Sequence, residues 1–285
     1  MEHRYPTITL FGSLSICGGE GAARTSLSGS TGDVFAYLLA YAGKDVRRER
    51  LADLFWTESE PARARAALNT AVWRINKALA GLDGIALKSG CEHLMLETCP
   101  EARVDAKLLE AAVRDASAQA AEGELDTLVR ARLAEVVDDY NGPFLDGSAS
   151  DWAIVERERL NSLHLRGLSI LMRDCAARRD YEEALVYGRR ILTTDPFREQ
   201  AQCEVMWLYV LNGQRPHALR QFETYRRQIA REMNVAPMAE TRALADYIRE
   251  GHDAAVEFAE LRSFGDLRAA TERSRRDAMA SFGIS

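Results

Sequence analysis

The sequence predicts a mainly α-helical protein in two parts, of which only the first contains strands. Three observations indicate this. Up to about residue 100, short stretches that alternate apolar and polar residues, such as 5–11, are mixed with helical spacing. From Ala106 onward the apolar spacing is almost entirely helical. The length of 285 residues is sufficient for two domains with cores of their own. We therefore expect an N-terminal domain over 1–100, a helical domain over 104–250 and an extra helical tail over 251–285.

The composition is that of a folded protein, with 47% hydrophobic and 28% charged residues. No apolar run approaches the roughly 18 residues that a membrane helix needs, and the N-terminus lacks the features of a signal peptide. We expect a cytoplasmic protein with no membrane partner. The five cysteines are scattered and form no disulfide framework. Cys91, His93 and Cys99 lack a fourth ligand at a zinc spacing, so we expect no metal.

The net charge of −6 is unevenly distributed along the chain. Residues 1–100 hold 11 basic and 11 acidic side chains, which leaves 26 basic and 32 acidic side chains for residues 101–285. A neutral N-terminal part can still present a local basic face to nucleic acid. The acidic remainder is expected to do something other than contact DNA.

The N-terminal part contains several short elements in a recognisable order. Two strands over 5–11 and 14–17 and a Gly/Ser/Thr-rich loop over 18–32 lead to a helix over 32–41. A second helix over 46–56 and a turn over 57–60 precede Pro61, which suits the start of a third helix. Two β-like segments, 85–88 and 93–97, then form a hairpin.

The third helix, from Pro61 to Leu79, is amphipathic. Leu68, Val72, Ile75 and Leu79 fall on one stripe. The opposite face is free of acidic residues, because no Asp or Glu occurs between 61 and 82. Arg and Lys can meet phosphates or guanine edges, and Asn can pair with adenine, so this face suits DNA. The alternative is an ordinary amphipathic surface helix.

Strands, three helices and a hairpin in this order are typical of a winged helix-turn-helix, whose third helix enters the major groove and whose hairpin is the wing. The segments 46–56 and 64–79 resemble the OmpR-type DNA-binding domain, in the version found in SARP-type (antibiotic-regulatory) activators. The resemblance covers most of 7–97. It departs from the family pattern at Asn76, where a second basic residue is usual, and we expect either a weaker phosphate contact or compensation by Lys77.

The resemblance implies three sets of functional residues. The DNA-facing residues of the third helix would be Arg63, Arg65, Asn69, Thr70, Trp73, Arg74 and Lys77. The wing residues that contact DNA would be Lys88, Ser89 and His93. The exposed acidic turn that could touch RNA polymerase would be Glu58, Ser59 and Glu60.

Three of these assignments have structural alternatives. Trp73 could cap the edge of the core, and His93 could be an ordinary hairpin residue. Arg65 could form a salt bridge with the acidic turn before the third helix. Trp56, just before that turn, is expected to pack in the core.

The C-terminal part contains a repeat. Helices are expected over 106–121, 124–140 and 151–178, and the segments 180–185 and 214–219 then recur with a spacing of 34 residues, since 218 minus 184 is 34. This is the tetratricopeptide spacing; an irregular helical bundle is the alternative. Together with Tyr-Asn-Gly-Pro-Phe-Leu at 140–145, Asp-Pro-Phe at 195–197 and Gln-Phe-Glu-Thr-Tyr at 221–225, the repeat resembles the bacterial transcriptional activator domain over 104–250.

The two resemblances together imply a sequence-specific, DNA-binding transcriptional activator that binds repeated half-sites as a homodimer and contacts RNA polymerase. The alternative is a helical-repeat adaptor whose winged helix does not read DNA, which the neutral N-terminal part and Asn76 favour. Binding of a small signal or peptide in the helical domain is left open. The chain has no phosphate-binding loop, nucleophile elbow or His-Glu-x-x-His motif, so we expect neither an enzyme nor a cofactor.

Overall fold

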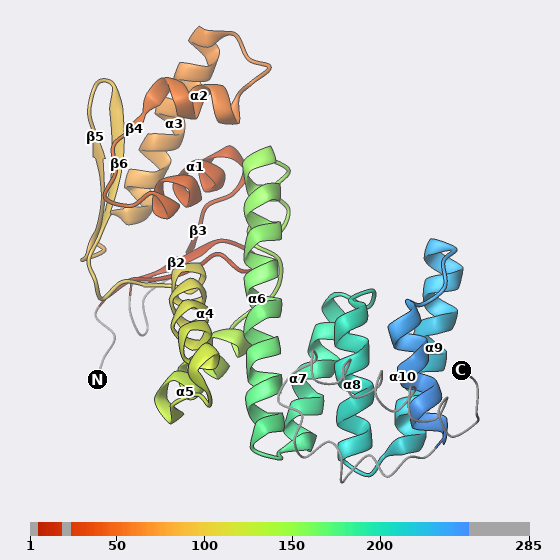
Figure 1. Cartoon of the computed structure of the whole chain (residues 1–285). Coiled ribbons are helices and arrows are strands. Elements are labelled where there is room, and N and C mark those ends of the chain that lie inside the picture. Colours follow the sequence, from red (N-terminus) through yellow and green to blue (C-terminus); the bar gives the residue numbers. More distant parts are fainter. Residues whose placement is uncertain (1–4, 19–23, 251–285) are drawn as a thin grey trace. The chain divides into compact units, whose positions relative to one another are not determined.

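The computed structural model describes residues 5–18 and 24–250 (Figure 1). The predicted tail over 251–285 lies outside the described residues. The chain forms two compact units, one of residues 1–115 and 131–164 and the other of residues 116–130 and 165–285. None of the helices within the described ranges is long and apolar enough to cross a membrane.

The first unit contains two small sheets and three helices of a winged helix-turn-helix. Its strands form the orders β3-β2-β1-β7 and β4-β6-β5. The strands are β1 (Thr7–Thr9), β2 (Ser15–Cys17), β3 (Thr25–Ser26), β4 (Val46–Arg47), β5 (Ile85–Ser89), β6 (His93–Thr98) and β7 (Arg103–Val104). The helices of the winged helix are α1 (Gly29–Ala40), α2 (Arg48–Phe55) and α3 (Pro61–Leu79). The mainly α fold class and the winged-helix order are confirmed.

Several predicted boundaries were wrong where elements are short. Helix α1 begins at Gly29, three residues earlier than expected, and the predicted loop before it contains β3. Residues 46–47 are not helical but form β4, which pairs antiparallel with β6. Residues 103–104, for which no strand was predicted, form β7, which pairs in parallel with β1. A strand of two residues has no detectable periodicity, and its partners are distant in sequence, so local patterns do not reveal it.

The core of the winged helix is made by apolar residues of all three helices and of the hairpin. Phe35, Leu38, Leu51, Leu68, Ile75, Leu94 and Leu96 are all almost completely buried. Because Leu68 and Ile75 lie on the apolar stripe of α3, burying that stripe leaves the opposite face of the helix outside.

The same compact unit also includes the beginning of the helical domain. Asp105, the first residue of α4 (Asp105–Glu122), accepts hydrogen bonds from the backbone N–H groups of Leu10 at 2.7 Å and Phe11 at 2.9 Å. Phe11 also forms a β-bridge with Phe144. These bonds satisfy buried amides at the end of β1, where the sheet offers them no partner.

A second set of contacts joins α1 to the first turns of α6 (Asp151–Ala177). The rings of Tyr37 and Trp152 meet edge to face, with centroids 5.2 Å apart. Ser148, just before α6, donates a hydrogen bond of 2.6 Å to the carboxylate of Asp33. Burial raises the pKa of Asp33, and the serine hydroxyl gives this carboxylate a partner. The winged helix and these segments are therefore parts of one packed unit.

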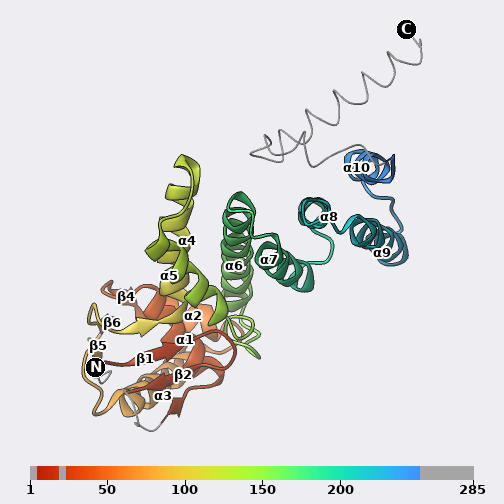
Figure 2. The same cartoon turned by 90° about the horizontal axis from the view of Figure 1, so that it is seen from below.

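The second unit is built from antiparallel helix pairs. Figure 2 shows α7 to α10 following one another as neighbouring helices. Their bounds are α7 (Tyr181–Thr194), α8 (Glu199–Leu211), α9 (Arg215–Met233) and α10 (Ala239–Glu250), while α5 (Thr127–Asp138) lies mostly in the first unit. The two segments of the predicted repeat begin α7 and α9, and the small residues Ala184 and Ala218 are fully buried at equivalent positions. Helix α7 approaches α8 so closely that a Cβ on Gly188 would lie 2.6 Å from the side chain of Val205.

A buried carboxylate connects α6 to the α4–α5 loop within the second unit. Asp174 contacts the guanidinium groups of Arg130 at 3.2 Å and Arg178 at 3.0 Å. It also accepts a hydrogen bond of 3.1 Å from the backbone N–H of Leu125. Paired and hydrogen-bonded in this way, the charge is compensated inside the protein.

Candidate nucleic-acid interface

Helix α3 is the element that presents the predicted DNA-facing residues. Pro61 occupies the first turn, where its missing N–H is not needed. The absence of further Pro or Gly, together with many Ala, Leu and Arg residues, keeps the helix intact for 19 residues. In Figure 1, α3 runs between α1 and α2 and beside the β5–β6 hairpin, the arrangement expected for a recognition helix and a wing.

All seven of the residues predicted to face DNA from α3 are exposed; they are Arg63, Arg65, Asn69, Thr70, Trp73, Arg74 and Lys77. Arg63, Arg65 and Arg74 have no ion-pair partner within the described parts of the chain. The alternative salt bridge of Arg65 with the turn is therefore not formed there. Because unpaired cations need no rearrangement to meet an anion, these arginines are available to phosphates.

Trp73 does not cap the core, because its side chain is 61% exposed. Its only aromatic or cationic contact in the described region is with Lys77, whose ammonium lies 5.2 Å from the ring centroid. By contrast, Trp56 is half-buried and meets Phe55 edge to face, so it packs only partly and is not the core residue that was expected. A large aromatic side chain in water on a basic helix face is typical of a binding surface.

Arg48, at the start of α2, is a residue that the sequence did not single out. Its guanidinium donates to the Asn69 side-chain oxygen at 2.9 Å, to Ser89 Oγ at 2.8 Å and to the carbonyl oxygen of Gly90 at 3.0 Å. One side chain therefore connects α2, α3 and the wing. The three partners lie 21 to 42 positions away in sequence, so no local motif announces the contact.

The wing residues all have partners within the protein. Lys88 forms an ion pair of 2.5 Å with Glu97 on the neighbouring strand. Ser89 accepts the bond from Arg48, and His93 is half-buried, with its backbone oxygen accepting a bond of 2.9 Å from Gly90. Lys88 and Ser89 are exposed at the wing and lie near α3 through Arg48, whereas the His93 side chain is less accessible.

The turn between α2 and α3 is accessible. Glu58, Ser59 and Glu60 are all exposed. No ion pair involves these carboxylates among the residues that the structure describes. The turn thus offers two negative charges directly before α3, with no ion-pair partner in the described part of the chain.

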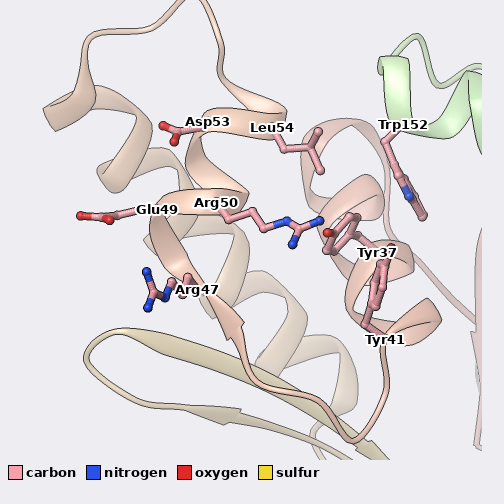
Figure 3. A pocket seen from close by; sticks show the side chains of 8 residues that line it. All are labelled: Tyr37, Tyr41, Arg47, Glu49, Arg50, Asp53, Leu54 and Trp152. Atoms are coloured by element: carbon pink, nitrogen blue, oxygen red, sulfur yellow. The ribbon is translucent and has the colours of Figure 1, made fainter.

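A shallow hollow of about 550 Å³ lies elsewhere on the first unit (Figure 3). In Figure 3 Arg50 points toward Tyr37, whereas Glu49 and Asp53 point away from it. Burial raises the pKa of the Tyr37 hydroxyl. No residue of α3 lines the hollow, and its opposite charges define no class of ligand; it is lined by Tyr37, Tyr41, Arg47, Glu49, Arg50, Asp53, Leu54 and Trp152.

A winged helix with an exposed, acid-free third helix, followed by helix pairs with a 34-residue spacing, defines a transcriptional regulator of two parts. Comparison with known proteins supports this class of protein. The chain matches the family described as bacterial transcriptional activator domain over residues 104–249, more than half of its length. It therefore belongs to that family, and the predicted resemblance to SARP-type activators is confirmed.

Among solved structures, the chain is similar to EmbR of Mycobacterium tuberculosis in complex with a low-affinity phosphopeptide. The TM-score is 0.69 at 19% sequence identity, and the match covers 97% of this chain and 72% of EmbR. At this identity the likeness shows the fold, which includes both parts of the chain. A search of curated proteins finds no match.

Proposed function

We propose that this protein is a sequence-specific DNA-binding transcriptional activator whose helix α3 enters the major groove. The observation that carries the proposal is the exposed face of α3, which has four cationic side chains and no acidic one between residues 61 and 82. Helix α3 also lies beside the β5–β6 wing, and the chain belongs to an activator family. Both facts support the same function. The protein would act in the cytoplasm, where bacterial DNA lies.

The affinity would come largely from phosphates. Arg74 and Lys77 lie at the C-terminal end of the exposed face, and neither is tied to an acidic residue in the described region. Each phosphate contact releases counterions, so log K is expected to fall linearly with log salt concentration, by about 0.9 for each contact. One winged helix contacts few bases, so we propose that two copies bind half-sites spaced by about 10 base pairs.

Replacing Arg74 and Lys77 together by alanine tests the proposal. The variant should bind every DNA sequence less tightly. The slope of log K against log salt concentration should become shallower by the contribution of about two phosphate contacts. The matched control replaces Arg226 and Arg231 by alanine, which removes the same charge from exposed positions of α9. Equal DNA binding by both variants and the unaltered protein would favour the adaptor instead.

We further propose that the turn before α3 contacts RNA polymerase. Glu58 and Glu60 are exposed and are placed at the base of the recognition helix, so a basic surface of a polymerase bound next to the site could reach them. Replacing both by glutamine should leave DNA affinity unchanged and lower transcription from a target promoter in vitro. Full transcription by that variant would exclude this contact.

A further inference from the structure

The exposed face of α3 has an apolar line along its middle. Ala66, Thr70 and Trp73 are separated by four and three residues, so they follow one another on the same side of the helix. All three are exposed. The basic residues Arg63 and Arg74 lie along one edge of this line, and amide side chains lie along the other.

Thr70 presents its methyl group, because its hydroxyl is engaged. Thr70 Oγ1 donates a hydrogen bond of 3.0 Å to the backbone oxygen of Ala66, one turn earlier. The hydroxyl hydrogen is therefore used within the helix. What Thr70 adds to the outer surface is chiefly a methyl group next to that of Ala66.

Trp73 extends the apolar line with the largest exposed aromatic surface of the helix. Its indole is 61% exposed, and the ammonium of Lys77 lies 5.2 Å from its ring centroid. That ammonium can meet a phosphate while the ring faces the groove floor. Apolar surface of this size gains free energy when a partner removes it from water.

Asn69 is held in one orientation by Arg48. A bidentate contact with adenine needs both the oxygen and the NH₂ group of the amide. The oxygen of Asn69 uses one of its two lone pairs to accept a hydrogen bond from Arg48, and because arginine has donors only, the amide is fixed with this oxygen toward Arg48. Any contact of Asn69 with adenine would therefore share that oxygen with Arg48. Arg48 is itself held by Ser89 and Gly90 of the wing.

We propose that α3 recognises A·T base pairs mainly through the C5-methyl group of thymine, which contacts Ala66, Thr70 and Trp73. Thymine is the base that offers an apolar group in the major groove, and alanine and threonine methyl groups and aromatic rings are its usual partners. Arg48 and Asn69 act as positioning residues that fix α3 to the wing. The inference rests on the proposed function and specifies which base the surface selects.

Deoxyuridine provides the test, because it keeps every hydrogen-bonding group of thymine and lacks only the methyl group. The full-length protein is measured on its selected DNA site, with each thymine replaced in turn. At one or more positions the affinity should fall about fourfold, the value for one buried methyl group. The loss should shrink in the Thr70→Ser variant, which retains the hydroxyl but lacks the methyl group, or in Trp73→Ala.

The matched control is Arg114→Ala, a change at an exposed residue of α4 that should leave the deoxyuridine effect intact. Equal affinity for thymine and deoxyuridine at every position would overturn the inference while leaving DNA binding in place. A deoxyuridine effect that is undiminished in both Thr70→Ser and Trp73→Ala would also overturn it. If the unaltered protein binds no DNA, the proposed function fails and the inference fails with it.

Discussion

Replacing Asp105 by alanine should strongly destabilise the first compact unit. One oxygen of this carboxylate accepts the backbone N–H groups of Leu10 and Phe11, at 2.7 and 2.9 Å. Both residues are almost fully buried, with 3% and 2% of their surface exposed. Alanine would leave both amides without their partner, at a cost of about 1–3 kcal/mol each. The expected loss is therefore about 2–6 kcal/mol, a large part of a typical domain's stability of about 5–15 kcal/mol.

The assay is urea unfolding followed by tryptophan fluorescence, since Trp56, Trp73 and Trp152 all lie in that unit. The control is Asp115→Ala on the same helix; its side chain is 44% exposed, and among the described residues its ion-pair partner is Arg114. A surface pair of this kind contributes about 0–1 kcal/mol. If Asp105→Ala lowered the free energy of unfolding no more than the control, the bonds from Asp105 to the end of β1 would not be holding the unit together.

Three further predictions concern the second unit. Asp174→Ala should cost about 1–3 kcal/mol by leaving the buried backbone N–H of Leu125 without its acceptor, whereas the exposed control Asp246→Ala should change the unfolding midpoint little; equal midpoints would contradict this. Gly188→Ala should lower the melting temperature, because its new methyl group would lie 2.6 Å from an α8 side chain; an unchanged or higher temperature would contradict the close packing. Burial raises the pKa of the Cys203 thiol to about 11, so in the folded protein it stays protonated as pH rises from 8 to 10. A maleimide should therefore label exposed Cys91 first and Cys203 only after unfolding, and equal labelling rates would refute the burial.

Much of the fold followed from the sequence, because the long elements have strong periodicity. Helix α3 begins and ends at the predicted residues, and the 34-residue spacing correctly marks the starts of α7 and α9. The two-residue strands β4 and β7 were missed, since their identity depends on partners in β6 and β1. Such pairing is a tertiary property that no local window contains.

The candidate site was predictable as a helix face but not as a set of contacts. Periodicity correctly separates the buried stripe of α3 from its exposed face. Periodicity could not decide whether Trp73 packs inward, because the exposure of this side chain depends on where the core of the folded unit ends. It also could not find Arg48, whose guanidinium meets Asn69 and Ser89 through the tertiary fold.

Whether residues 1–100 fold independently, as the sequence suggests, stays a prediction. Within the first unit, the backbone N–H groups just after β1 donate hydrogen bonds to Asp105, and β1 itself pairs with β7; both partners lie beyond residue 100. A fragment that ends at 100 loses these partners. We expect it to unfold at a lower temperature than the full chain, as circular dichroism would show.

Selection of bound sequences from random DNA, at two salt concentrations, tests the central claim most directly. The account predicts an enriched, repeated half-site that is rich in A·T pairs, with half-sites about one helical turn apart and an affinity that falls as salt rises. Folded protein that enriches no sequence at either salt concentration would contradict DNA recognition by α3.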